Sequence, residues 1–423
     1  MRANGLNGFL VGDLTRQHFR QLDGLRGIAI LLVMACHFDL LYRPADGDKG
    51  FISQIAQAGW MGVDLFFVLS GFLITGILLS TREKRHYFRN FLARRFLRIW
   101  PLYYANLIVF FIVLPLILPS APPALESMID KQAWFWLYGA NWLFAIEHGF
   151  NRTNGGYFWS LAVEEQFYLV WPLVVYWLSS KALMRVSIGL LCGSLLLRLA
   201  LVFMGFNLFS LYTVTFTHLD GLAIGAILAI ALRSPEGTAR LMRMLPYCAV
   251  VAVVALTIAR MRDGALFFWS YDTVLYGYTA VALLGGCALL WALRSHPGTV
   301  LNRILMSKPL ATTGRLSYAL YLIHAPAVAF ASMALLPRLA KYLPQWSYGA
   351  RYCLMLAIVM TGSWLLATAS WHLFEKRILA LKDRFAYEAS PKPNISASMD
   401  VQVTPAVAAA STVTGLPTSE RTA

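Results

Sequence analysis

Long apolar segments recur along most of the chain, and they constrain its fold more than any other feature. A helix needs about 20 predominantly apolar residues to cross a bilayer. Ten segments approach this length, and polar stretches separate them. They are approximately 25–42, 59–80, 99–118, 158–178, 186–205, 210–232, 245–262, 271–293, 315–336 and 350–374. The sequence therefore predicts an all-α fold, namely a polytopic membrane helix bundle with about ten transmembrane helices.

The composition argues against an ordinary soluble protein. Hydrophobic residues make up 58% of the 423 residues and charged residues only 13%. Soluble domains carry roughly 25% charged residues. The net charge of +15 is compatible with nucleic-acid binding, but in a membrane protein excess Lys and Arg belong to the cytoplasmic loops. We therefore expect the lipid bilayer as a partner, and no nucleic acid.

The distribution of Lys and Arg predicts the orientation of the bundle. With the N-terminus in the cytoplasm, the inner segments carry 23 of these residues and the outer segments carry 9. Both termini are then cytoplasmic, and the loop over residues 119–157 lies outside. The chain divides into a cytoplasmic segment 1–24, a transmembrane domain 25–384 and a cytoplasmic tail 385–423. The tail is rich in Ala, Ser, Thr and Pro and is predicted to be disordered.

Nine ionisable residues fall inside the predicted spans. A charge at the bilayer centre costs at least about 2.5–3.5 kcal/mol on insertion scales, so each of them is a candidate functional residue. Any one could instead be a structural residue that pairs with a neighbour. The nine are Arg26, His37, Asp64, Glu164, Glu165, Arg198, His218, Asp220 and His324. For Arg198 and Asp220 we favour a structural salt bridge.

Two of these residues share one face of the first helix. Arg26 and His37 lie 11 residues apart, which at ~100° per residue aligns them about 16 Å apart along the axis. This face then offers a cation that can pair with phosphate and, further along, a titratable imidazole. The alternative is an Arg that extends to the interface and a His bonded to a backbone carbonyl.

Carboxylates at the depth of His37 could orient its ring. Glu164 and Glu165 lie ~10 Å below the outer end of the fourth helix and point ~100° apart, so only one is expected to face the histidine. Asp64 lies at a similar depth on the second helix. It either orients an imidazole or caps its own helix near the headgroups.

Two arginines and a polar stripe complete the candidates. Arg95 and Arg98 lie three residues apart where the third helix begins. Two converging guanidinium groups could hold a phosphate or pyrophosphate, and the alternative is that they only set the topology. Ser317, Tyr321 and His324 recur at four- and three-residue steps on the ninth helix, so we expect this stripe to face the bundle. The sequence shows no cluster with metal-ligand spacing, and we expect no metal.

Five stretches together resemble the acyltransferase 3 family of integral membrane acyltransferases. They occur in family order over approximately residues 20–375. They are Leu22–Ala29 with His37 following, Gly62–Ile74, Arg94–Tyr103, Trp159–Tyr168 and Leu316–His324. One departure is visible, because His218 stands before Leu219 and Asp220 where the family often has Arg.

The resemblance implies a bacterial inner-membrane protein that transfers an acyl group, usually acetyl, from coenzyme A. Acceptors in the family are hydroxyls of O-antigen, exopolysaccharide, periplasmic glucan, Nod factor or macrolide sugars. By position, Arg26 and His37 match the family's essential Arg and His, and Arg95 and Arg98 match its cytoplasmic Arg-x-x-Arg motif. Some relatives carry a fused extracytoplasmic hydrolase-like domain, and we expect none here.

The resulting hypothesis places acetyl-CoA on the three arginines, with its pantetheine arm reaching toward His37. His37 acts as the general base, and Glu164 or Asp64 orients its ring. Direct attack on the thioester and an acyl-His intermediate are both open. The competing class is a transporter or flippase of a modified glycolipid that uses the buried charges as a proton relay. Neither the acceptor nor the oligomeric state follows from the sequence.

Overall fold

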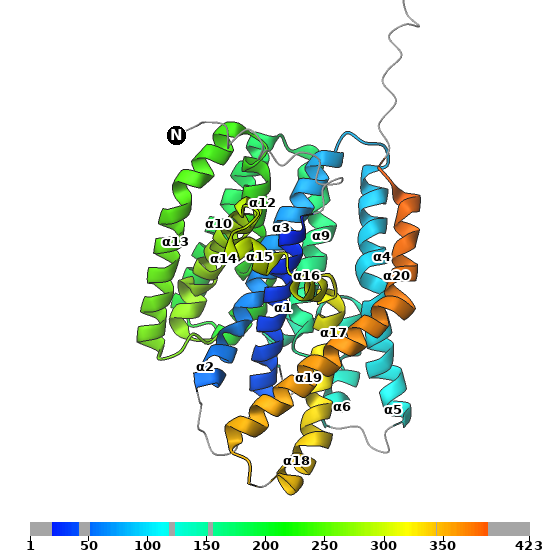
Figure 1. The fold of residues 1–423 in the computed structure, drawn as a ribbon. Coiled ribbons are helices and arrows are strands. Elements are labelled where there is room, and N and C mark those ends of the chain that lie inside the picture. The colour runs from blue at the N-terminus through cyan, green and yellow to red at the C-terminus, as the bar shows by residue number, and fades with distance from the viewer. Residues whose placement is uncertain (1–18, 42–50, 118–122, 151–154, 344, 388–423) are drawn as a thin grey trace, which may run out of the picture.

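The structure is a computed structural model, and it describes residues 19–41, 51–117, 123–150, 155–343 and 345–387. Within these ranges every regular element is a helix, and there is no strand. Figure 1 shows the helices gathered into one bundle. Most of the predicted tail 385–423 and most of the predicted segment 1–24 lie outside the described residues, but residues 385–387 are described and pack against α4, so the tail begins later than predicted.

The bundle combines long helices with short ones and with 3-10 and π turns. The longer helices are α1 (Arg20–Leu41), α3 (Met61–Thr81), α4 (Tyr87–Ile108), α9 (Phe158–Trp177), α10 (Ser180–Phe203), α12 (Asp220–Ala231), α13 (Pro235–Asp263), α14 (Tyr278–Arg294), α17 (Ser317–Phe330) and α19 (Tyr348–Ser370). The shorter ones are α2 (Phe51–Gln57), α5 (Leu114–Ile117), α6 (Pro123–Ile129), α7 (Gln132–Trp136), α8 (Ala140–Ile146), α11 (Leu208–Thr213), α15 (Val300–Leu305), α16 (Lys308–Arg315), α18 (Leu336–Tyr342) and α20 (Lys376–Leu379). The 3-10 and π turns are η2 (Ala58–Trp60), η3 (Val109–Val113), η4 (Thr215–Thr217), η5 (Thr273–Gly277), η6 (Ala331–Leu335), η7 (Trp371–Glu375) and η8 (Ala380–Phe385).

Among the described residues, eight helical segments are long and apolar enough to cross a membrane. They coincide with eight of the ten predicted spans, and they confirm the all-α polytopic membrane bundle. Of the other two predicted spans, 158–178 is the single helix α9, which carries two glutamates. The span predicted over 210–232 is interrupted, because Val214 has an extended backbone between α11 and the turn η4 that precedes α12.

Helix α4 begins at Tyr87, well before the start predicted for the third span at residue 99. Arg94, Arg95 and Arg98 therefore lie within this helix and not at its start. Arginine is a good helix former, so a run of arginines ends an apolar segment without ending the helix. The early start places two of these arginines on a face that lines a pocket described below.

Helices α3 and α12 form the closely packed centre of the bundle, with α1, α9 and α14 against α3. Glycines remove the side chains that would hold α3 and α12 apart. A Cβ on Gly71 would lie 2.1 Å from the carbonyl oxygen of Leu222, and a Cβ on Gly225 would lie 2.2 Å from that of Val68. These distances are far below van der Waals contact, so this crossing requires glycine at both positions.

A buried ion pair joins the helices beside this centre. Arg198 on α10 lies 2.8 Å from Asp220 on α12, and both side chains are fully buried. Thr279 on α14 donates to Asp220 at 2.8 Å and accepts from Arg198 at 2.6 Å. The predicted structural salt bridge between Arg198 and Asp220 is confirmed.

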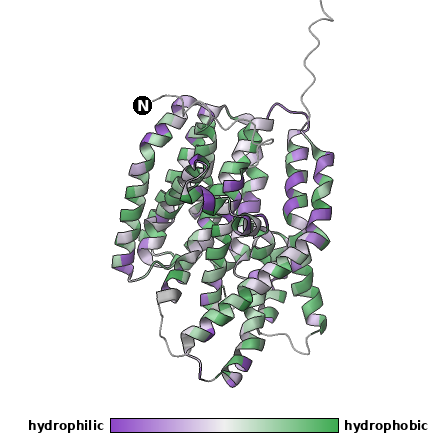
Figure 2. Ribbon diagram, viewed as in Figure 1, coloured by the Kyte–Doolittle hydropathy of each residue, from purple (hydrophilic) through white to green (hydrophobic). Residues whose placement is uncertain are grey.

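The hydropathy of the bundle changes from its outside to its centre. Helix α13 exposes a run of valines, including Val250, Val251, Val253 and Val254, as expected of a surface that faces lipid. Figure 2 shows hydrophilic residues gathered near the middle of the molecule and along α4 and α20. There α15 and α16 pack against α1, and α20 packs against α4.

Candidate functional site

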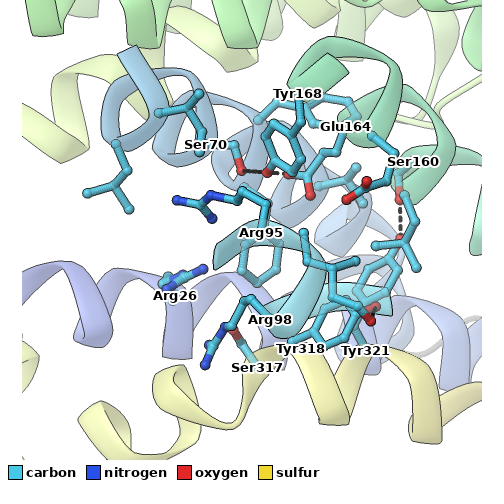
Figure 3. Close-up of a pocket in the computed structure, with 18 residues that line it drawn as sticks. Arg26, Ser70, Arg95, Arg98, Ser160, Glu164, Tyr168, Ser317, Tyr318 and Tyr321 are labelled. Atoms are coloured by element: carbon cyan, nitrogen blue, oxygen red, sulfur yellow. Dashed lines mark hydrogen bonds between the residues drawn. The ribbon is translucent and has the colours of Figure 1, made fainter. Parts of the chain in front are cut away.

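A pocket between α1, α3, α4, α9 and α17 contains most of the predicted site residues (Figure 3). Its lining is apolar on the side formed by Val63, Phe66 and Phe67. The polar lining residues are Arg26, Ser70, Arg95, Arg98, Ser160, Glu164, Glu165, Tyr168, Ser317, Tyr318 and Tyr321. In Figure 3 the three arginines lie on one side of the pocket, and Glu164 and Ser160 lie on the other.

The three arginines come from two helices and converge, and none of them has a counter-ion among the described residues. Arg26 lies on α1, and Arg95 and Arg98 lie on one face of α4. In the described part of the chain, no carboxylate oxygen lies within the 4.0 Å ion-pair limit of any of their nitrogens. The Nε of Arg26 is buried and has no hydrogen-bond partner in the part of the chain that the structure describes. Three guanidinium groups with unused donors form a site for an anion with several oxygens.

An aromatic side chain positions one of these arginines. The Cζ atom of Arg95 lies 5.6 Å from the centroid of the Tyr168 ring, at cation-π distance. The Tyr168 hydroxyl in turn donates to Ser70 Oγ at 2.9 Å. The arginine side and the acidic side of the pocket are therefore connected through Tyr168.

The two glutamates of α9 diverge, as their adjacent positions predicted. Glu164 faces the pocket and accepts a hydrogen bond of 2.6 Å from Ser70 Oγ. Glu165 points toward α4, where Trp100 Nε1 donates to it at 3.0 Å. Among the described residues, no hydrogen bond joins Glu164 to His37, and the charges of Arg26 and Arg95 act on Glu164 instead. Similar depth in the membrane did not bring the carboxylate and the imidazole together.

Asp64 orients a different imidazole from the one predicted. Its Oδ1 lies 3.1 Å from Nε2 of His218, and both residues are completely buried. The prediction that Asp64 orients His37 is therefore wrong. The reason is the tight crossing of α3 and α12, because the backbone of Gly221 packs beside Asp64 and Phe67 and brings His218 to this face of α3.

His37 is oriented by its own helix. Its Nδ1 lies 3.0 Å from the carbonyl oxygen of Val33, one turn earlier. This bond requires a proton on Nδ1, so the neutral ring presents Nε2 as a proton acceptor. A backbone carbonyl therefore orients the His37 ring, a role that we had expected of a carboxylate. The bond to a carbonyl was the alternative interpretation of His37, and it leaves Nε2 available for chemistry.

A second histidine lies against His37. The rings of His37 and His324 are 4.9 Å apart between centroids, with an interplanar angle of 62°. Nδ1 of His324 lies 3.0 Å from the carbonyl oxygen of Leu320, and its buried Nε2 has no hydrogen-bond partner within the described ranges. The polar stripe of α17 does face the bundle, as predicted. That its histidine meets the histidine of α1 was not predicted, because spacing within one helix says nothing about its neighbour.

Tyr321 lies between the arginine pocket and the histidine pair. It lines the pocket, its hydroxyl lies 2.5 Å from Ser160 Oγ, and it donates to the carbonyl oxygen of Tyr157 at 3.1 Å. Its ring centroid is 5.6 Å from that of His324. A ligand that is anchored on the arginines and extends toward Tyr321 therefore approaches the histidines.

Sequence reasoning missed the roles of Ser70 and Ser160, since single serines carry no signal in an apolar helix.

Comparison with known proteins agrees with this arrangement. The model of a family described as "Acyltransferase domain" matches residues 19–368. The chain is 31% identical over 340 residues to the peptidoglycan O-acetyltransferase OatA of Listeria monocytogenes, which covers 76% of this chain and 51% of the relative. It is 29% identical over 325 residues to the O-acetyltransferase OatA of Staphylococcus aureus, and this match covers 73% of this chain and 50% of the relative. The chain thus spans about half the length of these curated relatives. No solved structure matches it significantly.

Proposed function

The chain belongs to this acyltransferase family, and we propose that it is a membrane O-acetyltransferase that uses acetyl-CoA. The proposed acceptor is a hydroxyl of a cell-wall or exported glycan, and the proposed location is the bacterial cytoplasmic membrane. The relative named as a peptidoglycan O-acetyltransferase supports this class of acceptor. One observation carries the proposal: the pocket that holds the guanidinium groups of Arg26, Arg95 and Arg98 is also lined by Tyr321, whose ring centroid lies 5.6 Å from that of His324. His324 packs against His37, and a backbone carbonyl orients each imidazole.

The arginines suit the nucleotide end of acetyl-CoA. Its pyrophosphate and 3′-phosphate supply the negative charge that Arg26, Arg95 and Arg98 lack within the described residues. Guanidinium groups bind such oxygens through paired hydrogen bonds. Arg26 and His37 are about 16 Å apart along α1, which an extended pantetheine arm can span. Glu164 lines the path and is available to accept hydrogen bonds from the amide groups of that arm.

His37 acts as the general base in the proposed reaction. Its Nε2 takes the proton of the acceptor hydroxyl while the hydroxyl oxygen bonds to the acetyl carbonyl carbon. The carbon–sulfur bond breaks, and the leaving thiolate takes the proton from the imidazolium. The products are an O-acetyl ester and free CoA. The Val33 carbonyl holds the proton on Nδ1 throughout, and His324 packs against the ring as a positioning residue.

Mass spectrometry of cell-surface glycans tests the proposal in cells. Three strains are compared: one with the gene, one without it, and one with a His37→Gln variant. We expect O-acetyl groups on one glycan fraction in the first strain only. Identical glycans in all three strains would contradict a glycan acetyltransferase. A change in the amount of exported glycan without a change in acetylation would instead indicate the transporter alternative.

A further inference from the structure

The chain after α19 lies beside the arginine pocket. We call residues 376–387 the C-terminal strap; they contain α20, the 3-10 turn η8 and two further residues. Figure 1 shows α20 alongside α4, the helix that carries Arg95 and Arg98. The strap follows the residues that the family model matches, which end at 368.

The strap is anchored to α4 through its main chain. Arg94 donates to the carbonyl oxygen of Lys382 at 2.9 Å, and Asn90 donates to that of Ala386 at 2.9 Å. The Cζ of Arg94 also lies 5.8 Å from the centroid of the Tyr387 ring. None of these contacts uses the ammonium group of Lys382. The anchor therefore fixes the backbone of the strap without engaging this cation.

The Lys382 ammonium is a further positive charge near the arginines of α4. Arg94, which binds the Lys382 carbonyl, lies four residues, about one helical turn, before Arg98 on α4. Lys382 therefore lies near the arginine face of that helix, and it is half-buried. Within the described ranges, no carboxylate oxygen lies within the 4.0 Å ion-pair limit of its Nζ. Like charges brought together away from water repel one another unless an anion lies among them. This crowding fits a ligand with several negative charges better than one with a single carboxylate.

We propose that Lys382 is a fourth phosphate-binding group of the donor site, and that the C-terminal strap holds it there. The ligand class is a nucleotide that carries more than one phosphate. The inference rests on the proposed function, because that function supplies coenzyme A as the ligand. It adds a binding residue that lies beyond the matched family region.

Equilibrium binding of CoA to the purified full-length protein tests this role. Lys382→Ala removes the ammonium and keeps the carbonyl that Arg94 binds. We expect it to raise the Kd by about 10- to 150-fold, the range for a lost charge-assisted contact. Lys382→Arg keeps the charge and should bind CoA within a few-fold of wild type. The matched control is Arg384→Ala, which removes an exposed cation from the same turn η8 and should leave the Kd unchanged.

The outcomes separate this inference from the proposed function. A wild-type protein that does not bind CoA contradicts the proposed donor site itself. If wild type binds CoA and Lys382→Ala binds it equally well, the role of Lys382 is overturned. If Arg94→Ala weakens CoA binding and Lys382→Ala does not, the strap acts only through its packing on α4. The contact between Lys382 and a phosphate is then overturned. Dephospho-CoA identifies the phosphate: if it binds wild type and Lys382→Ala equally, the contact is with the 3′-phosphate.

Discussion

At the residue scale, the sharpest prediction concerns the proton acceptor Nε2 of His37. His37→Gln keeps much of the size of the side chain but cannot take a proton at neutral pH. We expect acetyl transfer by the purified variant to fall by about 10²–10⁴-fold, the usual range for general-base catalysis. CoA binding should persist, because Arg26, Arg95 and Arg98 are untouched. Near-normal transfer by His37→Gln would contradict the assignment and make His324 the next candidate.

A second residue-scale prediction concerns the arginine pair of α4. The double variant Arg95→Ala, Arg98→Ala should weaken CoA binding, since each lost charge-assisted contact costs about 1.5–3 kcal/mol. Lys at both positions should restore binding only in part, because it lacks the two-pronged geometry of guanidinium. Titration calorimetry measures the affinity, with Arg185→Ala as the control for an exposed cation on α10. Unchanged affinity in the double variant would leave these arginines a purely topological role.

At this scale the sequence predicted positions on a helix better than contacts between helices. The spacing of Arg26 and His37 and the divergence of Glu164 and Glu165 follow from helical geometry alone. The partner of Asp64 does not, because it depends on how α3 and α12 are turned toward each other. Periodicity within one segment contains no information about that rotation.

At the element scale, the crossing of α3 and α12 makes a stability prediction. Gly71→Ala places a Cβ 2.1 Å from the Leu222 carbonyl oxygen, so the helices must separate. Overpacking of this kind typically costs about 1–3 kcal/mol, and thermal unfolding in detergent should show a lower Tm. Gly189→Ala on α10 is the matched control, because nothing lies within 4 Å of the added atom. Since Ala favours helix over Gly by about 1 kcal/mol, the control should keep or raise the Tm. An equal fall in Tm in both variants would contradict the close crossing of α3 and α12.

The elements themselves were predicted well where apolar residues decide them. Eight predicted spans correspond to helices long and apolar enough to cross a membrane in the described chain. The interruption near Val214 was missed because most residues from 208 to 216 are apolar, although Thr213 and Thr215 flank Val214. Local side-chain bonds mark it instead: Asn207 accepts from the backbone of Ser210, and Thr217 donates to the carbonyl of Val214. Such bonds compete with a continuous helix.

At the scale of the whole molecule, the account predicts which side of the membrane each end faces. If the excess of Lys and Arg marks the inner segments as predicted, the arginine pocket and the C-terminal strap face the cytoplasm, where acetyl-CoA is made. Reporter fusions after residue 384 and within the loop 119–157 should give opposite signals. Matching signals would contradict this topology. The arginine pocket would then not be placed on the side of the membrane where acetyl-CoA is made.

The central claim is that one chain both binds acetyl-CoA and transfers its acetyl group to a glycan hydroxyl. The most direct test uses the purified full-length protein in lipid nanodiscs, where both faces are accessible, with acetyl-CoA and soluble peptidoglycan fragments. The measurement follows CoA thiol release and acetyl ester formation together. We expect equal amounts of both products from the wild-type protein. We expect neither product from His37→Gln, although this variant still binds CoA. A wild-type protein that binds acetyl-CoA but forms no ester would contradict the claim.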